Sequence, residues 1–152
     1  MRTTLAPGTT VPVGQLVGCV YCLRDIDGHP LYVGQATGTG ERVGERIGRH
    51  VLGQRSDAAG RCFPPYEVHS IDVHPIRTVA TRDTPLTPTE RKRVNRAEAQ
   101  LYAKLLKSPV PPLNERQPKA AGSMVRLTGA ISVPLTTSAT LIDALWDKDV
   151  RV

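Results

Sequence analysis

Residues 16–34 read LVGCVYCLRDIDGHPLYVG, and this stretch predicts a β-hairpin. The run at residues 16–24 is rich in Val, Leu and Tyr, which favours a first strand. Asp27 and Gly28 lie in the turn that follows, and Asp-Gly is a strong short-range signal for a hairpin. Residues 31–34 then predict a second strand, antiparallel to the first.

A helix is expected after the hairpin, at about Glu41–Leu52, beyond a glycine-rich loop at residues 35–40. The loop lacks the spacing and the lysine of a Walker phosphate loop, so it is interpreted as a strand-to-helix connection. Val43, Ile47 and Val51 recur every four residues and predict the buried stripe of the helix.

Beside this buried stripe the same helix carries basic side chains at helical spacing: Arg42, Arg46, Arg49 and His50. A charged stripe is normally a solvated surface, but this one has no acidic partner four residues along, which favours contact with an anion. Gly44 and Gly48 weaken the helix and allow another element to approach its backbone closely.

A third strand is predicted at residues 66–76, where apolar and polar residues alternate. The clearest start signal for a helix is Thr87-Pro88-Thr89-Glu90, which combines a capping Thr, a Pro at the first helical position and a Glu that reaches back to the cap. This helix is expected to run to about Lys107. Its apolar face consists of Val94, Ala97, Leu101 and Leu105.

Glu98 lies on the apolar face of this predicted helix. A carboxylate on a buried helix face costs several kcal/mol unless a cation, a metal or hydrogen bonds compensate it. We therefore expect Glu98 to have a partner, and it is the strongest single indication of chemistry in the chain.

The chain carries a net charge of +6 and a pI of about 9.6, which favours polyanionic partners such as nucleic acid. It contains no apolar run of about 18 residues or more, so no membrane-spanning helix is expected. The N-terminal residues lack the apolar segment of a signal peptide, and a cytoplasmic location is expected.

Three cysteines, Cys19, Cys22 and Cys62, do not predict a disulfide framework. Cys19 and Cys22 are three residues apart on a predicted strand, so their thiols should point to opposite faces of the sheet. This arrangement favours packing over a zinc site.

Three segments are predicted along the chain. Residues 1–15 are rich in Thr, Pro and Gly and are expected to form an irregular lead-in. Residues 16–117 hold the elements described above. Residues 118–152 form a C-terminal extension of the same domain or a dimer contact, with an apolar–polar run at 130–135 and a short helix at about 138–146.

The order of these elements resembles the GIY-YIG nuclease domain family. The two naming motifs of that family correspond to Cys19-Val20-Tyr21 and Tyr32-Val33-Gly34, with ten residues between the two tyrosines. Arg46 and His50 are four residues apart on one helix face and are similar to the family's Arg followed by Tyr or His. Glu98 resembles the family's helix-borne metal carboxylate, and Asn114 its late asparagine.

The resemblance implies an α+β fold, with a small antiparallel sheet of about three strands flanked by helices. It also implies a metal-dependent endonuclease that hydrolyses phosphodiester bonds in DNA. Glu98 would hold Mg²⁺ or Mn²⁺, Tyr21 would orient or deprotonate the attacking water, and Arg46 would neutralise phosphoryl charge. Tyr32 would position these groups, and His50 would bind a phosphate oxygen or the water. The expected substrate-binding residues are Arg42, Arg49, Gln35 and Asn114.

Four positions depart from the family pattern. Cys19 stands where the first naming motif has Gly, which is a conservative change for a small strand residue. Arg42 lies one turn before Arg46 and is an alternative catalytic arginine. Gln35 stands where the family often has a lysine. Asn114 lies sixteen residues after Glu98, about one helical turn more than the family leads us to expect.

The chain is similar to stand-alone, restriction-type members of the family, which cut both strands as dimers, so a homodimer is expected. Two other functions stay open. The first is a non-catalytic nucleic-acid-binding module on the same fold. The second is an enzyme on this scaffold that acts on a small anionic metabolite, which the basic stripe would grip.

Overall fold

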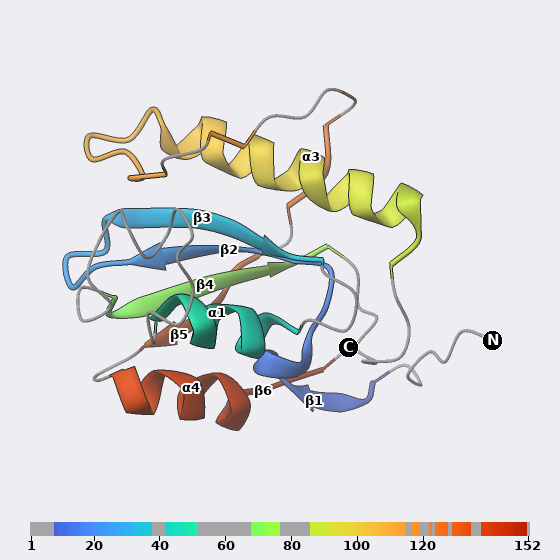
Figure 1. Ribbon diagram of the computed structural model, residues 1–152, viewed down its shortest axis with the longest axis vertical. Helices are drawn as coiled ribbons and strands as arrows, with labels where there is room; N and C mark the ends of the chain where they lie inside the picture. The colour runs from blue at the N-terminus through green and yellow to red at the C-terminus, as the bar shows by residue number, and fades with distance from the viewer. Residues whose placement is uncertain are drawn as a thin grey trace.

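The computed structural model describes residues 8–37, 42–51, 68–76, 86–114, 117–118, 122, 124–127, 129–134 and 138–151 (Figure 1). Within these ranges the chain is an α+β fold with two antiparallel sheets and three α-helices, in agreement with the predicted fold class. No helix in this part of the chain is long and apolar enough to cross a membrane.

The larger sheet has four antiparallel strands in the order β3-β2-β4-β5, one more than the sequence predicts. The hairpin of β2 and β3 is where the sequence predicts it, and its register places Tyr21 opposite Gly34. Residues 66 and 67 of the predicted third strand lie outside the described residues. The strands are β2 at Cys19–Arg24, β3 at Pro30–Ala36, β4 at Ser70–Pro75 and β5 at Ile131–Pro134.

The hairpin turn is held by the side chain of Asp25. Its Oδ1 accepts hydrogen bonds from the backbone N–H of Asp27 at 2.9 Å and from the backbone N–H of His29 at 2.8 Å. Gly28 has a φ of +81°, a conformation that disfavours any residue with a Cβ. The Asp-Gly pair therefore fixes the register of the two strands on which the candidate site depends.

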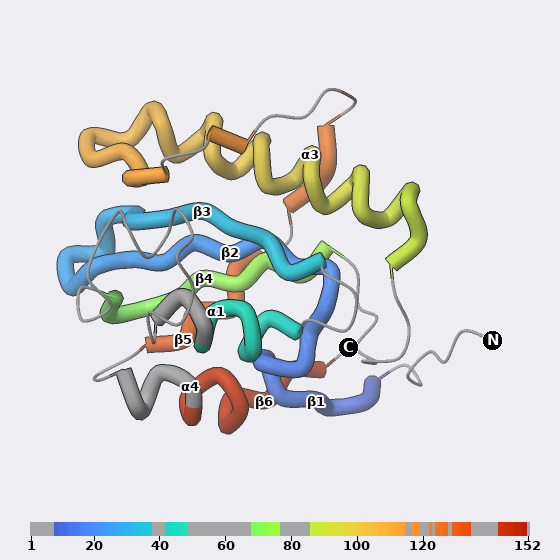
Figure 2. Tube along the Cα trace, in the orientation of Figure 1, coloured from blue at the N-terminus to red at the C-terminus, as the bar shows by residue number. Residues whose placement is uncertain are grey.

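A second, two-stranded sheet pairs β1 at Thr10–Pro12 with β6 at Asp149–Arg151 (Figure 2). A 3-10 turn, η1 at Val13–Gln15, follows β1 directly. Residues 10–15 are therefore ordered, where composition alone predicts an irregular lead-in. The reason is tertiary, because the partner strand lies at the other end of the described chain.

Helices cover both faces of the larger sheet. On one face α3 packs with Val20 and Val33 of the hairpin, and on the other α1 and α4 share a core with Tyr21, Leu23 and Ile71. Figure 1 shows this layering, with α3 on one side of the strands and α1 and α4 on the other. The helices are α1 at Val43–Val51, α3 at Pro88–Leu105 and α4 at Ser138–Asp147.

The start of α3 is the predicted capping box. The Thr87 side chain accepts a hydrogen bond from the Glu90 backbone N–H at 3.2 Å, and the Glu90 carboxylate accepts one from the Thr87 N–H at 3.0 Å. Such a cap is worth about 1 kcal/mol. It fixes where the helix begins and hence which face Glu98 occupies.

Trp146 of α4 packs between two glycines, one in η1 and one in α1. A Cβ at Gly14 or at Gly44 would lie 3.0 Å from the Trp146 side chain. Gly44 thus permits the close approach to the helix backbone that the sequence predicts. The indole also lies beneath Arg42, whose guanidinium carbon is 5.5 Å from the centre of its ring. Through Trp146 the C-terminal segment supports α1.

Cys19 and Cys22 are both buried and unpaired in β2. Cys19 belongs to the core under α1, whereas Cys22 lies opposite Asp72 and Val33 on the other face of the pleat. Burial raises the pKa of each thiol to about 12. This placement agrees with packing, and Cys62 lies outside the described residues.

Candidate active site

Tyr21 occupies the centre of the candidate site and is fully buried. Its ring lies across Gly34, its cross-strand partner, so closely that a Cβ at Gly34 would stand 2.5 Å from the tyrosine hydroxyl. Only glycine leaves room for the phenol at this position. The glycine of Tyr32-Val33-Gly34 therefore leaves the space in which the tyrosine ring of the neighbouring strand packs.

Arg46 of α1 reaches this phenol from the helix that covers the sheet. Burial raises the pKa of Tyr21 well above its usual range, and the charge of Arg46 and its hydrogen bond to the phenol oppose that rise. Tyr32 and Glu98 raise the pKa further. Burial outweighs the cation, so the hydroxyl stays protonated at neutral pH.

Glu98 approaches the same place from α3. It is half-buried, and loss of solvation raises the pKa of its carboxyl to about 7, with Arg46 acting in the opposite direction. No residue in the described part of the chain forms a hydrogen bond or close ion pair with this carboxylate. The buried acid predicted from the sequence is present, and its charge is only partly compensated by Arg46.

Tyr32 lies in β3, opposite Leu23, and is half-buried against the core beneath α1. It shares a face of the strand with Gly34 because alternate residues of a strand point the same way. Its effect on the pKa of Tyr21 places the two phenols in one environment. The structure thus brings together Tyr21, Tyr32, Arg46 and Glu98.

Arg42 and Arg46 differ in what they contact. Arg42 forms an ion pair with Glu45 at 3.0 Å and lies over the Trp146 ring, whereas Arg46 interacts with Tyr21 and Glu98. No acidic residue lies four residues after Arg42, as expected from the sequence, but Glu45, three residues along, does pair with it. Of the two arginines, Arg46 is the one directed at the phenol and the carboxylate.

Asn114 binds the backbone of the second motif. Its side-chain amide donates to the Val33 carbonyl oxygen at 2.9 Å, and its Oδ1 accepts from the Val33 N–H at 3.0 Å. The Leu113 N–H also donates to the Leu31 carbonyl oxygen at 2.8 Å. Residues 113 and 114 therefore satisfy the exposed edge of β3. Asn114, expected among the substrate-binding residues, is used here to hold the strand that carries Tyr32 and Gly34.

Three other predicted site residues remain. One of them lies away from Tyr21 and Glu98, and the side chains of the other two are not described by the structure. Gln35 alternates with Gly34 and so points to the face opposite the Tyr21 ring, where its Oε1 accepts a bond from Thr37 Oγ1 at 3.4 Å. Arg49 and His50 lie in the backbone of α1. Their side chains lie outside the described part of the structure.

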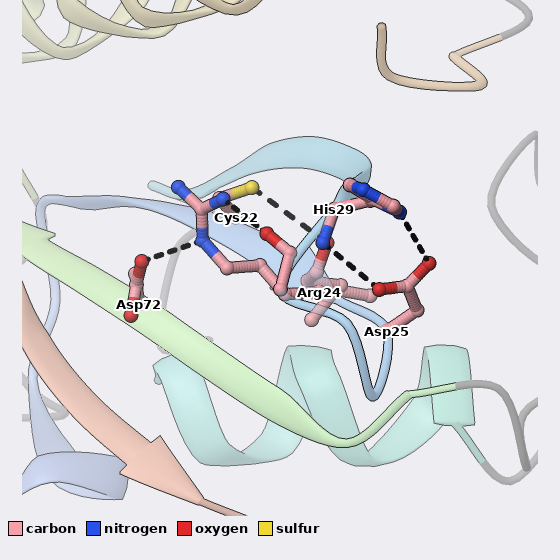
Figure 3. A network of polar contacts seen from close by, with 7 residues as sticks. Cys22, Arg24, Asp25, His29 and Asp72 are labelled. Carbon is pink, nitrogen blue, oxygen red and sulfur yellow. Dashed lines mark hydrogen bonds and ion pairs between the residues drawn. The ribbon is translucent and has the colours of Figure 1, made fainter. Parts of the chain in front are cut away.

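A second polar network, at the turn end of the hairpin, escaped the sequence reasoning (Figure 3). The Arg24 guanidinium donates to Asp72 Oδ2 at 2.7 Å and to the Gly28 carbonyl oxygen at 2.8 Å. Asp25 Oδ2 lies 3.4 Å from His29 Nδ1. Among the described residues, Asp25, Asp27 and His29 are the one group whose ligand atoms all lie within 4.8 Å of one another. Asp25 already caps the turn, which accounts for the cluster without an ion.

None of the protein-family models, curated proteins or solved structures with which the chain was compared matches it.

Proposed function

We propose that the chain is a metal-dependent endonuclease that hydrolyses phosphodiester bonds in DNA with a GIY-YIG-type site. The observation that carries the proposal is the convergence of a half-buried carboxylate, an arginine and a buried phenol from three different elements. Glu98 comes from α3, Arg46 from α1 and Tyr21 from β2. Perturbed ionisable groups gathered in this way are typical of active sites.

A hard divalent cation fits the residues present. Mg²⁺ is commonly held by one or two carboxylates, with the substrate phosphate and waters completing its shell. Glu98 is a half-buried carboxylate whose raised pKa reports a lack of compensating charge, and it has no close ion-pair partner among the described residues. When bound at Glu98, Mg²⁺ or Mn²⁺ would act as the Lewis acid for the phosphate.

The side chains of the chain supply the other functions that phosphodiester hydrolysis needs. Arg46 lies beside Glu98 and is suited to stabilising the charge that develops on the phosphate. Tyr21, protonated and bonded to Arg46, is suited to orienting the attacking water or a phosphate oxygen. Tyr32 shares the environment of Tyr21 and is suited to positioning it. Asn114 holds the backbone of β3, the strand that carries Tyr32 and Gly34.

The test is cleavage of plasmid DNA and labelled oligonucleotides with Mg²⁺ or with EDTA. Wild-type protein should cut only with the metal, and Glu98→Ala and Glu98→Gln should lower the rate at least about a hundredfold. Asp143→Asn is the matched control, since Asp143 is an exposed carboxylate on α4. It should retain the wild-type rate.

Other outcomes separate the alternatives. Full activity of Glu98→Gln would overturn the assignment of the metal carboxylate. Salt-sensitive DNA binding without cleavage of duplex, branched or single-stranded substrates would favour a non-catalytic binding module. Cleavage of both strands by wild-type protein would call for two copies of the single site, and so for a homodimer.

A further inference from the structure

A groove runs along the outward side of α3, away from the candidate active site. It has a volume of about 500 Å³, within the range of ligand pockets. Arg96 and Glu98 are two residues apart and so lie about 200° apart around the helix, which places the groove and the carboxylate on opposite sides of α3. The groove is lined by Arg96, Ala99, Gln100, Ala103, Lys104, Lys107, Gly122 and Met124.

The groove is basic, and its charge is not compensated by any residue that the structure describes. Arg96, Lys104 and Lys107 all line it, and none of the described lining residues is acidic. None of these three cations forms an ion pair with a residue in the ranges that the structure describes. The Nε of Arg96 is buried and meets no hydrogen-bond acceptor within those ranges. The part of the fold that the structure describes therefore does not pair these positive charges.

The second wall of the groove is built into the fold. The Gln100 side chain donates to the Val125 carbonyl oxygen at 2.8 Å and accepts from the Val125 N–H at 3.0 Å. Val125 is buried in the core cluster that includes Val94, Ala97 and Leu101 of α3, and its bonds to Gln100 tie the segment carrying Met124 to the helix. At Gly122 a Cβ would lie 2.5 Å from Arg96 Cδ, so the arginine passes directly against this wall.

The floor of the groove is apolar. Ala99 and Ala103 provide it from the helix, and Met124, which is 82% exposed, projects from the opposite wall. A flexible thioether at the surface is typical of sites that accept apolar side chains of a partner. None of the described residues that line the groove is aromatic, whereas grooves for single-stranded nucleic acid use aromatic platforms for the bases.

From these features we infer that the groove docks an acidic, amphipathic peptide segment of a partner protein. Carboxylates of the segment pair with Arg96, Lys104 and Lys107, and its apolar side chains contact Ala103 and Met124. Charge complementarity selects the partner, and the apolar floor contributes affinity. This docking site does not depend on the proposed nuclease activity, because it lies across α3 from Glu98.

The test is fluorescence anisotropy with a labelled peptide of about twelve residues, with Asp and Glu on one helical face and Leu on the other. Wild-type protein should bind it, and Lys104→Glu/Lys107→Glu should weaken binding at least about tenfold. Met124→Asp should weaken it as well. The matched control is Arg91→Glu/Lys92→Glu, which reverses two exposed charges of α3 that do not line the groove. It should bind like wild type.

Lys104 and Lys107 are exposed, so their reversal should leave the melting temperature nearly unchanged, which circular dichroism checks. Equal losses in the groove variant and in the control would mean general attraction to a basic surface and would overturn the inference. So would a lack of binding at about 1 mM peptide. A labelled oligothymidylate that binds in place of the peptide, and is lost only in the groove variant, would assign the groove to nucleic acid instead.

Discussion

Glu98 should make the stability of the protein depend on pH in an unusual direction. The folded state raises the pKa of its carboxyl from an ordinary 4.5 to about 7. Between these values the folded chain holds a proton that the unfolded chain has released. The contribution of this carboxyl to the free energy of unfolding is therefore fully present below pH 4.5 and is lost as pH rises through 7. The loss is on the order of 2–3 kcal/mol.

Glu98→Gln should remove this loss. The variant is expected to melt like wild type near pH 4 and roughly 5–10 °C higher than wild type at pH 8, because Gln imitates the protonated acid. Calorimetry at both pH values measures the difference. Mg²⁺ should raise the melting temperature of wild type at pH 8 and leave the variant unchanged. A variant less stable than wild type at pH 8 would show that the carboxylate is already compensated.

Gly34 is the second position where a single substitution should change both stability and cleavage. Gly34→Ala places a methyl group against the Tyr21 phenol, which is fully buried and has no free direction in which to move. We expect a loss of about 1–3 kcal/mol in the free energy of unfolding, together with loss of cleavage. Gly129→Ala is the control, since nothing lies within 4 Å of its added Cβ. Chemical denaturation compares the two, and equal effects would contradict the packing argument.

At the scale of elements, α4 supports the helix that carries Arg46. Trp146 fills the space between Gly14 and Gly44 and lies beneath Arg42. Trp146→Ala should lower the free energy of unfolding by about 2–4 kcal/mol, because it leaves a cavity and removes the cation–π contact.

The same variant should also reduce cleavage, since α1 would lose the surface that holds it against the sheet. Trp146→Phe, which keeps an aromatic ring beneath Arg42, should recover part of both losses. Urea denaturation and the plasmid assay measure them. Wild-type cleavage by a correctly folded Trp146→Ala protein would show that Arg46 is positioned without α4.

At the scale of the whole molecule, local signals were sufficient for part of the fold. The Asp27-Gly28 turn and the Thr87 capping box define elements through neighbouring residues alone, and both are where the sequence predicts them. Strand β5 is different, because Ile131–Pro134 acquires its role by pairing with β4, some sixty residues earlier. The pairing of β1 with β6 spans still more of the chain. No local pattern specifies such partners.

The residues of the candidate site likewise fall into two groups: those that a local sequence pattern identifies and those that only the assembled fold identifies. Glu98 could be singled out because an acid on an apolar helix face is conspicuous within one element. Choosing between Arg42 and Arg46 needs Trp146, a residue of a distant helix, and the sequence offers no spacing that links them. The use of Asn114 likewise depends on the open edge of β3, which only the assembled sheet defines.

The pairing of β1 with β6 also has a consequence for the order of events during synthesis. Ribosomes deliver the N-terminal part of a chain first, and the hairpin of β2 and β3 can form as soon as it emerges. The packing of α1 must wait, because Trp146 and residues 149–151 are translated more than ninety residues later. Until translation has passed α4, a nascent chain therefore carries Arg46 on a helix that packs on η1 and the hairpin but lacks the support of Trp146. The candidate site is therefore fully assembled only after the segment that carries α4 and β6 has been translated.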